Sequence, residues 1–481
     1  MVRWLRWVGF SRRLVFAMMV ICLVAAPAAA QISAPEMTSA QPLTVEQLLV
    51  LEAQVPGTEA SSGYGFSVAL SDDGMTALVG APFDDCEAGS NCGAAQVLVR
   101  SGGAWIEQAQ LTASDRAAGA ELGTSVALSG DGSIALVGAL RADCPTGSQC
   151  GAAYVFVRSG QSWTQVQKLF ASDAVGSDFF GQSVDLSLDG SVALVGATLT
   201  ACPNLISTCG AAYVFVRTGG SWIETARLDP SGSNGLDGFG FSVSLSDDGT
   251  IALIGAPVAN CGGTPCGQVF VFVGSGATWT EEQKFTDSNP GFFDQFGYSV
   301  SLSSDGSVAL IGELSDDCAA GSQCGAAYVF ARNGGQWTQS AKLTIPDNSG
   351  DDFFGIRVAL AGDALHALIG ANALGPCPPG GTCRLAYVFV EDAGLWREKQ
   401  RLTATRPCGG GPLATTVALS ENADRALVGA HFSSCPGDPG EAYIFGSVPS
   451  PSPLEIPTAS GAGLAVLAIA LAAIGAAMLR R

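Results

Sequence analysis

Cysteine is the residue type whose spacing in this 481-residue chain points most directly to chemistry. Six close pairs recur along the chain, and the two members of each pair are five to seven residues apart. Such recurrence predicts a disulfide framework if the chain leaves the reducing cytoplasm. Structural zinc is a weaker interpretation, because each loop offers two cysteines and zinc takes four ligands. The pairs are Cys86/Cys92, Cys144/Cys150, Cys202/Cys209, Cys261/Cys266, Cys318/Cys324 and Cys377/Cys383.

Residues that commonly carry out catalysis are scarce or lack a recognisable arrangement. His366 and His431 are the only histidines, and neither adjoins a nucleophile motif. The sequence contains no Gly-x-Ser-x-Gly elbow, phosphate-binding loop or histidine pair at metal-ligand spacing. We therefore predict no catalytic, cofactor-binding or metal-ligating residue, and a binding protein rather than an enzyme. An exported polysaccharide hydrolase or lyase and a structural cell-envelope component remain the alternatives.

The N-terminal segment and the charge of the chain predict export. Residues 1–30 combine a start with four arginines, an apolar run over residues 14–25 and an Ala-Ala-Ala cleavage site, as in a secretory signal peptide. Their removal leaves 19 basic against 43 acidic residues. So acidic a chain disfavours nucleic acid and anionic lipid as partners, since both require a basic surface.

One phrase, Gly-x-Ser-Val-Ala-Leu-Ser-x-Asp-Gly-x-x-Ala-Leu-Val-Gly-Ala, recurs seven times at intervals of 57 to 59 residues. A fixed period of this size marks a repeat architecture, in which each unit is buried against its neighbours. Each copy contains four short apolar or alternating segments separated by turn signals, which predict four antiparallel strands. Seven such units predict a seven-bladed β-propeller. The valines of the phrase are Val68, Val126, Val184, Val243, Val300, Val358 and Val417.

The two ends of the repeat region indicate how the domain is bounded. The seventh copy lacks its fourth strand, and residues 45–53 resemble the missing one, so we expect an N-terminal strand to close the last blade. The predicted fold is thus an all-β propeller over residues 43–446, followed by a Pro/Ser linker at 447–455 and a C-terminal segment at 456–481. Within this segment the 21 residues 459–479 are uncharged and precede Arg480-Arg481, which is long enough for a transmembrane helix.

Carboxylates gather in loops that this topology places at one rim. In an up-and-down blade, the blade-to-blade connection and the loop between strands two and three lie at the same rim. Loops on a rigid scaffold commonly bind ligands, but a solvated acidic edge that keeps the protein soluble is an equally natural interpretation. Cys408 and Cys435 also fall in loops of this rim, which predicts a bridge between them. The candidate binding residues are Asp84, Asp85, Asp178, Asp237, Asp294, Asp316, Asp317, Asp351 and Asp352.

Two residues depart from the repeat on the innermost strands. Asp185 replaces the usual alanine or serine in the third copy, and Arg357 replaces the usual serine in the sixth. Both should face the axial channel or the neighbouring blade. A water-filled channel tolerates such residues, and the sequence alone favours that interpretation over a ligand site.

The repeat resembles the FG-GAP repeats of integrin alpha-chain propellers and their bacterial relatives. Phe-Gly pairs such as Phe180-Gly181 and Phe239-Gly240 and the Gly-Ala-Pro steps at 80–82 and 255–257 show the resemblance. It implies an extracellular seven-bladed propeller that binds proteins or carbohydrates. Calcium is the ion that the resemblance would imply, but the usual Asp-x-Asp-x-Asp-Gly loop is absent. The short Ser-Asp-Asp-Gly turns offer too few oxygens for calcium.

The C-terminal segment resembles the IPTL type of sorting signal in Gram-negative bacteria. Ile456-Pro457-Thr458-Ala459-Ser460 precedes the apolar stretch and the final arginines. Ala459 stands where leucine is usual, so the motif is degenerate. The resemblance implies a protein of the cell envelope or cell surface, anchored by its C-terminal helix or released by an exosortase-like processing enzyme.

Overall fold

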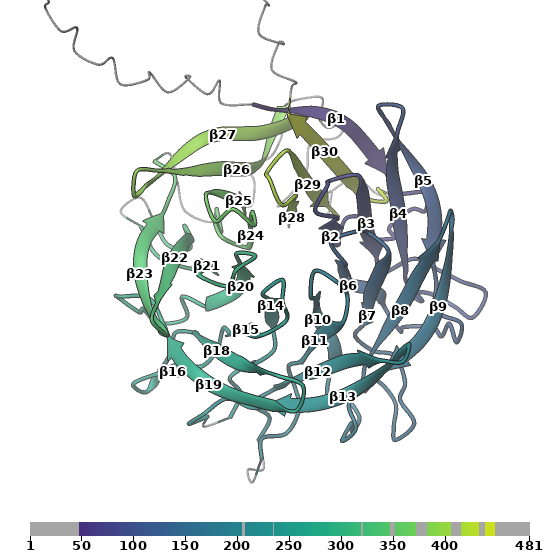
Figure 1. The fold of residues 1–481 in the computed structure, drawn as a ribbon, viewed down its shortest axis with the longest axis horizontal. Coiled ribbons are helices and arrows are strands. Elements are labelled where there is room, and N and C mark those ends of the chain that lie inside the picture. The colour runs from purple at the N-terminus through teal and green to yellow at the C-terminus, as the bar shows by residue number, and fades with distance from the viewer. Residues whose placement is uncertain are drawn as a thin grey trace, which may run out of the picture. The chain divides into compact units, whose positions relative to one another are not determined.

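The computed structural model describes residues 48–203, 207–233, 235–318, 321–346, 352–371, 382–405, 415–431 and 438–447. Within these ranges the regular elements are all strands, and they form seven four-stranded antiparallel sheets and one two-stranded hairpin. The sheets are arranged as blades around an axis, with their first strands innermost (Figure 1). The predicted all-β, seven-bladed propeller is therefore confirmed.

Blades 1 to 4 follow one another along the chain, and each runs from the axis outward. Blade 1 is β2 (Ser67–Leu70), β3 (Thr76–Ala81), β4 (Ala94–Ser101) and β5 (Ala104–Leu111). Blade 2 is β6 (Leu122–Leu128), β7 (Ile134–Ala139), β8 (Ala152–Ser159) and β9 (Ser162–Leu169). Blade 3 is β10 (Phe180–Leu186), β11 (Val192–Ala197), β12 (Ala211–Thr218) and β13 (Ser221–Leu228). Blade 4 is β14 (Ser242–Leu245), β15 (Ile251–Ala256), β18 (Gln268–Ser275) and β19 (Thr278–Phe285), with the hairpin β16 (Asn260–Cys261) and β17 (Thr264–Pro265).

Blades 5 to 7 repeat the pattern and complete the ring. Blade 5 is β20 (Phe296–Leu302), β21 (Val308–Glu313), β22 (Ala326–Asn333) and β23 (Gln336–Leu343). Blade 6 is β24 (Arg357–Leu360), β25 (His366–Gly370), β26 (Thr382–Asp392) and β27 (Leu395–Thr405). Blade 7 is β28 (Thr415–Leu419), β29 (Arg425–Ala430), β30 (Glu441–Ser447) and β1 (Leu49–Pro56).

The outer strand of blade 7 comes from the other end of the chain. β1 pairs antiparallel with β30, from Leu49 opposite Ser447 to Pro56 opposite Glu441. The expected closure of the last blade by an N-terminal strand is therefore confirmed. The closure covers an edge of β30 that would otherwise present unpaired backbone groups.

Burial follows position within the blade. The Ala-Ala-Tyr-Val-Phe stretch that opens β8 is fully buried, because a third strand is covered on both faces by neighbouring blades. The outermost strand β9 alternates between exposed and half-buried residues. The cores therefore lie between adjacent blades, and each blade depends on two neighbours.

A repeated hydrogen bond near the axis joins six of the seven blades to the blade that follows. Ser67 Oγ on β2 donates to the carbonyl oxygen of Gly123, the second residue of β6 in blade 2, at 2.7 Å. Thr416 Oγ1 of blade 7 makes the equivalent bond to Gly65 O at 2.8 Å and so closes the ring. The other bonds are Ser125 to Gly181, Ser183 to Gly240, Ser242 to Gly297 and Ser299 to Gly355.

The predictions for the two ends of the chain concern residues outside the described ranges. These are the signal peptide at 1–30, the C-terminal segment at 456–481 and, apart from Ser447 at the end of β30, the linker at 447–455. No helix in the described part of the chain is long and apolar enough to span a membrane.

The glycine of each Val-Gly-Ala step is predicted to be irreplaceable. A Cβ atom at Gly196 would lie 2.0 Å from Gly240 O of the next blade and 2.4 Å from Ser183 Oγ. Gly196→Ala should therefore lower the free energy of unfolding by about 3 kcal/mol or more, because the overpacked atoms are backbone. Chemical denaturation measures this change. Gly147→Ala is the control, since its Cβ would have no neighbour closer than 3.5 Å; equal stability of the two variants would contradict the proposed packing.

Candidate functional site

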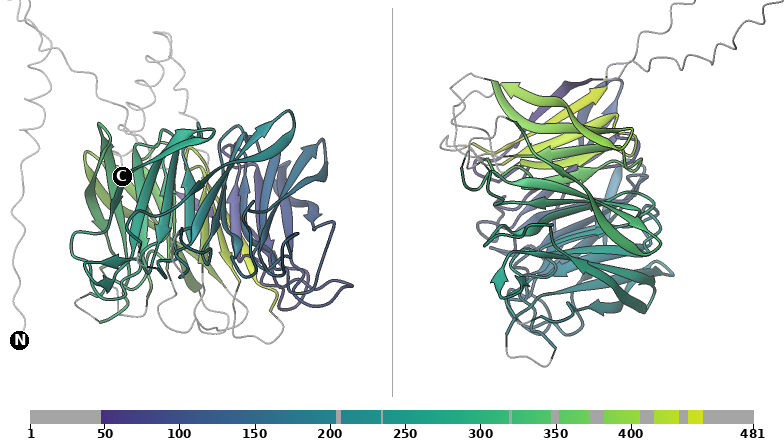
Figure 2. Two further views of the ribbon diagram at one scale, coloured as in Figure 1. Left: turned by 90° about the horizontal axis from the view of Figure 1, so that it is seen from below. Right: turned by 90° about the vertical axis from the view of Figure 1, so that its left-hand side faces the viewer.

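Disulfide-bonded loops line one rim of the propeller. Five of the predicted pairs are bonded, Cys86–Cys92, Cys144–Cys150, Cys202–Cys209, Cys261–Cys266 and Cys318–Cys324, and these predictions are confirmed. Each bond closes the loop between the second and third strands of its blade, and these loops gather at one edge of the ring (Figure 2). We call these loops, together with the blade-to-blade connections that contact them, the cysteine rim.

Each disulfide loop also holds the following blade. The carbonyl oxygen of Cys150 accepts the N–H of Phe180, the first residue of β10, at 2.9 Å. Cys209 and Cys266 make the same bond to Phe239 and Phe296, also at 2.9 Å. The disulfides therefore fix the backbone of the rim at the points where one blade docks on the next.

The connections are tied to the same loops from the other side. Ser177 N donates to Gln149 O at 3.1 Å, and Phe293 N donates to Pro265 O at 2.7 Å. Each of these bonds joins a blade-to-blade connection to the disulfide loop of the preceding blade. In the described part of the rim, the loops and connections of neighbouring blades are therefore joined by hydrogen bonds.

Two of the predicted rim residues support the disulfide loops and remain exposed. Asp85 Oδ1 accepts the N–H of Asn91 at 3.0 Å, and Asp317 Oδ1 accepts that of Gln323 at 3.1 Å. Both donors have a left-handed backbone, with φ of 56° and 58°. These carboxylates therefore stabilise a tight loop from outside while staying accessible to a ligand.

Four other predicted residues lie inside the connections instead of on their surface. Asp178, Asp237, Asp294 and Asp352 are only 1–7% exposed. Asp178 Oδ2 accepts the N–H of Val175 at 2.8 Å, and Asp294 Oδ2 accepts that of Gly291 at 2.5 Å. Burial raises the pKa of the Asp178, Asp237 and Asp294 carboxyls. These side chains shape the loops, and a ligand role for them stays a prediction; Asp351 lies outside the described residues.

Asp84 and Asp316 occupy equivalent positions just before their disulfides. Asp84 is buried, lies 3.7 Å from the Arg116 guanidinium and accepts a bond from Gln110 Nε2 at 3.1 Å. Its burial, together with the charge of Glu59, raises its pKa to about 6. Asp316 forms an ion pair with Lys342 at 2.7 Å. Both carboxylates are thus engaged by neighbouring side chains.

An acidic cluster between blades 4 and 5 was not predicted from the sequence. Glu313, at the end of β21, is fully buried, and both its carboxyl oxygens lack a hydrogen-bond partner in the described structure. Burial and the charges of Asp287, Asp316 and Asp294 raise its pKa to about 9. Glu313 is therefore protonated at neutral pH. The sequence does mark this position, because Glu313 follows Gly312 where every other copy of the repeat has alanine after the glycine.

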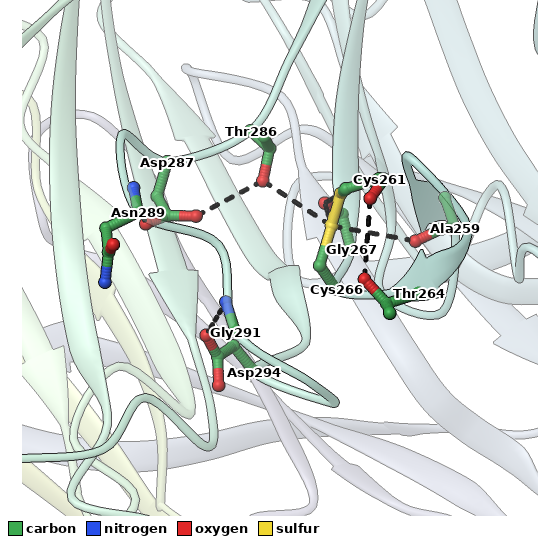
Figure 3. The surroundings of a disulfide bond; sticks show 10 residues. All are labelled: Ala259, Cys261, Thr264, Cys266, Gly267, Thr286, Asp287, Asn289, Gly291 and Asp294. Atoms are coloured by element: carbon green, nitrogen blue, oxygen red, sulfur yellow. Dashed lines mark hydrogen bonds between the residues drawn. A yellow bond between two sulfur atoms is a disulfide. The ribbon is translucent and has the colours of Figure 1, made fainter.

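Figure 3 shows two of these acids beside the disulfide of blade 4. Asp287 Oδ2 accepts the N–H of Asn289 at 2.8 Å, and Asp294 bonds Gly291 in the same connection. Among the residues that the structure describes, no group of three His, Cys, Asp or Glu side chains is arranged to hold a metal ion. Both carboxylates accept backbone N–H groups of their own connection, and a ligand role for Asp294 stays a prediction.

Apolar side chains on the cysteine rim were also missed. Phe292 and Phe293 are 69% and 45% exposed, and their rings meet edge to face at 4.5 Å. Leu236 and Val175, in the two preceding connections, are 70% and 54% exposed. Exposed large apolar side chains on rigid loops are typical of interaction surfaces. The sequence signal available was a set of apolar residues inside otherwise acidic connections.

The opposite rim carries the Asp-Gly turns between first and second strands. In the turn of blade 1, Asp73 Oδ1 accepts bonds from Ser71 Oγ at 2.7 Å and from Met75 N at 2.8 Å. Asp131, Asp189, Asp248 and Asp305 have the same serine and backbone partners. In each case one carboxylate is used to close a hairpin turn.

The axial channel contains a cavity of about 350 Å³, lined by inner-strand residues of all seven blades. Asp185, one of the two departures in the repeat, accepts the N–H of Leu245 in the next blade at 2.7 Å and that of Leu186 at 2.9 Å. It therefore links blades 3 and 4. Arg357, the other departure, lines the cavity.

These features define a class: a seven-bladed repeat propeller with disulfide-bonded loops on one rim. The family model of the FG-GAP repeat matches six segments that together cover more than half of the chain, and the chain belongs to this family. The matched segments are 56–98, 105–156, 163–215, 222–272, 279–330 and 337–389. Disulfides and FG-GAP repeats are typical of extracellular or surface proteins.

Solved structures add information on the fold alone. One chain of a structure described as "Crystal Structure of Mitotic Checkpoint Complex" is 12% identical, with a TM-score of 0.50, over 88% of this chain and 99% of that one. In all, 664 solved chains match, so the fold is widely shared and does not identify a function. No curated protein matches the sequence.

The predicted Cys408–Cys435 bridge lies outside the described residues, as does Cys377, and nothing is described of the Cys383 side chain in β26. Peptide mapping of the unreduced protein should find Cys408 linked to Cys435 and Cys377 linked to Cys383. The Cys144–Cys150 bridge serves as the internal control. A free thiol at Cys408 or Cys435 would contradict the predicted bridge in blade 7.

The raised pKa of Glu313 predicts a pH-dependent stability. Between its ordinary value of 4.5 and about 9, the folded protein holds a proton that the unfolded chain releases. The contribution of this group to the free energy of unfolding is therefore fully present below about pH 4.5. It decreases as the pH rises towards about 9. Glu313→Gln removes this proton exchange, so its stability relative to the native protein should increase from about pH 5 to about pH 8.

Thermal unfolding across this pH range measures the difference between the two proteins. The same substitution at the exposed Glu87 is the control and should not change the pH dependence. Identical pH profiles for Glu313→Gln and the native protein would show that Glu313 is ionised in the folded state.

Proposed function

We propose that this protein is an exported, surface-associated propeller that binds an extracellular protein or carbohydrate at its cysteine rim, without catalysing a reaction. Phe292 and Phe293 support this proposal most directly. They are exposed, and their connection is bonded at Phe293 N to the disulfide loop of blade 4. Aromatic side chains dominate binding energy where they become buried by a partner.

The rigidity of the rim favours binding over its alternatives. A loop held by a disulfide and by hydrogen bonds to neighbouring loops loses little conformational entropy when it meets a ligand. The exposed carboxylates of Asp85 and Asp317 add polar groups to the same rim. An apolar centre with a polar surround is the usual anatomy of a protein interface.

Anchoring belongs to the same proposal. An N-terminal signal peptide and a C-terminal apolar segment at 456–481 are consistent with retention in the cell envelope of a Gram-negative-type bacterium. Cleavage by an exosortase-like enzyme would release or transfer the propeller. In either case the cysteine rim is presented outside the cytoplasm, where disulfides persist.

Binding of the purified full-length protein to arrays of glycans and extracellular proteins tests the proposal. A Phe292→Ser/Phe293→Ser double variant should lose at least about tenfold in affinity for the ligand found, equivalent to about 1.4 kcal/mol. Ile223→Ser is the matched control, since Ile223 is an exposed apolar residue on the outer strand β13.

The same samples should be assayed with and without chelator and in a panel of polysaccharide hydrolase and lyase assays. Binding that survives the double variant would place the ligand elsewhere than on the cysteine rim. Turnover that is abolished by one carboxylate substitution would replace the binding proposal with an enzymatic one.

A further inference from the structure

The axial cavity is built from three layers that repeat around the ring. The valines of the repeat, such as Val126 and Val184, form an apolar layer. Hydroxyls of the serine layer donate to the next blade, as Ser125 does to Gly181 O. The third layer, contributed by the residue before each serine, is the most variable, and it includes Phe66, Gln182, Phe241 and Tyr298. The chemistry of this cavity therefore varies in the third layer and, within the serine layer, at Arg357 of blade 6.

Four consecutive blades each contribute one aromatic or polar side chain to an arc along the wall of the cavity. Gln182 comes from blade 3, Phe241 from blade 4, Tyr298 from blade 5 and Arg357 from blade 6. The Phe241 and Tyr298 rings are 4.8 Å apart, and the Arg357 guanidinium lies over the Tyr298 ring at 5.3 Å. The arc thus presents two aromatic rings between an amide and a cation.

The polar ends of the arc are not used by the protein. Within the described structure, the Gln182 amide and the Tyr298 hydroxyl form no hydrogen bond, and Arg357 donates only through Nη1, to Ile356 O at 2.8 Å. Arg357 has no ion pair with any described carboxylate, and it is the only charged residue among those that line the cavity. Its remaining N–H groups are available to an anionic ligand.

The presence of Arg357 also removes a hydrogen bond between blades, and a ligand-binding role would account for this loss. At the position of Arg357 five other blades carry a serine, and blade 7 carries Thr416, whose hydroxyls bond the next blade. Blade 6 forgoes this bond. An unpaired guanidinium in its place is the strongest available group for a carboxylate, because its donors match the two oxygens.

A sugar with one carboxylate fits this combination of groups. Aromatic rings pack against the C–H face of a sugar, and the amide and hydroxyl can bond its hydroxyl groups. The cavity of about 350 Å³ is near the lower end of the range for small-molecule sites, about 300–1,000 Å³. A polysulfated chain is disfavoured, because a formal net charge of −20 repels polyanions that a single arginine cannot offset.

A peptide carboxylate fits the cavity less well. Protein sites for a chain terminus commonly use clustered backbone N–H groups. Here each inner strand is the edge strand of its sheet, and N–H groups on its open edge, such as those of Leu245, Leu302 and Leu360, already donate to side chains of the preceding blade. The Arg357 guanidinium, by contrast, donates only to Ile356 O among the described residues. The side-chain chemistry therefore favours a saccharide.

We propose that the axial cavity binds the acidic end of a glycan, a sugar of the uronic acid class, with Arg357 holding its carboxylate and Phe241 and Tyr298 contacting its ring. This inference rests on the proposed binding function and adds a second site on the axis, separate from Phe292 and Phe293.

Calorimetric titration of the full-length protein tests the axial site. The probes are D-glucuronate and D-galacturonate, with D-glucose and D-galactose as neutral counterparts and acetylphenylalanine as a model of a peptide terminus. At least one uronate should bind with a dissociation constant of about 1 mM or below, and about tenfold or more tighter than its neutral counterpart.

Arg357→Ser should abolish the preference for the acidic sugar. It introduces the residue found at this position in five blades, so the fold should be retained, and circular dichroism and thermal unfolding check this. Arg158→Ser, at the end of β8, removes the same charge from the outer part of a blade and should leave uronate binding unchanged.

The axial site is overturned if neither uronate binds at a concentration of about 10 mM, which is ten times the expected dissociation constant. It is also overturned if they bind no better than the neutral sugars, if Arg357→Ser binds them as tightly as the native protein, or if acetylphenylalanine alone binds. The rim proposal can hold even if the axial site fails. In that case Arg357→Ser should still bind the ligand found on the arrays, and the Phe292/Phe293 double variant should not.

Discussion

The close approach of two glycines at six of the seven blade boundaries is the constraint on which this propeller depends. The carbonyl of the Phe-Gly glycine in one blade lies against the Cα of the Gly-Ala glycine in the blade before it, as Gly240 does against Gly196. A serine hydroxyl from the same earlier blade, Ser183 Oγ, donates to that carbonyl at 2.8 Å. Any side chain at Gly196 would push the two blades apart. Glycine is therefore required here for the close approach of the blades as well as for backbone conformation.

This boundary determines where the rim loops can be. The phenylalanine beside the Phe-Gly glycine uses its N–H to bond the second cysteine of the preceding blade, as Phe180 does with Cys150. The residue that closes the loop as a disulfide is therefore also the residue whose carbonyl binds the next blade. A short disulfide ring stabilises by about 2 kcal/mol in the chain-entropy model, and here it also positions a carbonyl that the next blade requires. The cysteine rim is rigid for this reason, although its loops have little core of their own.

Much of this architecture could be predicted from sequence, because it repeats and because the relevant signals are local. The period defined seven blades, the paired cysteines defined the loops, and the incomplete seventh copy indicated the closing strand β1. The orientation of individual side chains could not be predicted in the same way. Asp178 and Asp237 lie in surface loops, yet both are buried. Asp178 turns inward because the tight connection needs an internal acceptor for the N–H of Val175. The environment of Glu313 depends on carboxylates from two blades, which no single repeat reveals.

These placements change the electrostatic picture that composition suggests. The formal charge of −20 counts every carboxylate as ionised. Burial and neighbouring acids keep Glu313 protonated at neutral pH, while Asp316 and Asp115 are paired with lysines. The rim is therefore less uniformly negative than its sequence, and exposed apolar side chains stand among its acids. On the axis the balance is reversed, because Arg357 is the single charge lining the cavity. An acidic protein thus presents a local cationic point surrounded by aromatic rings, and short-range contacts instead of long-range attraction must select what binds there.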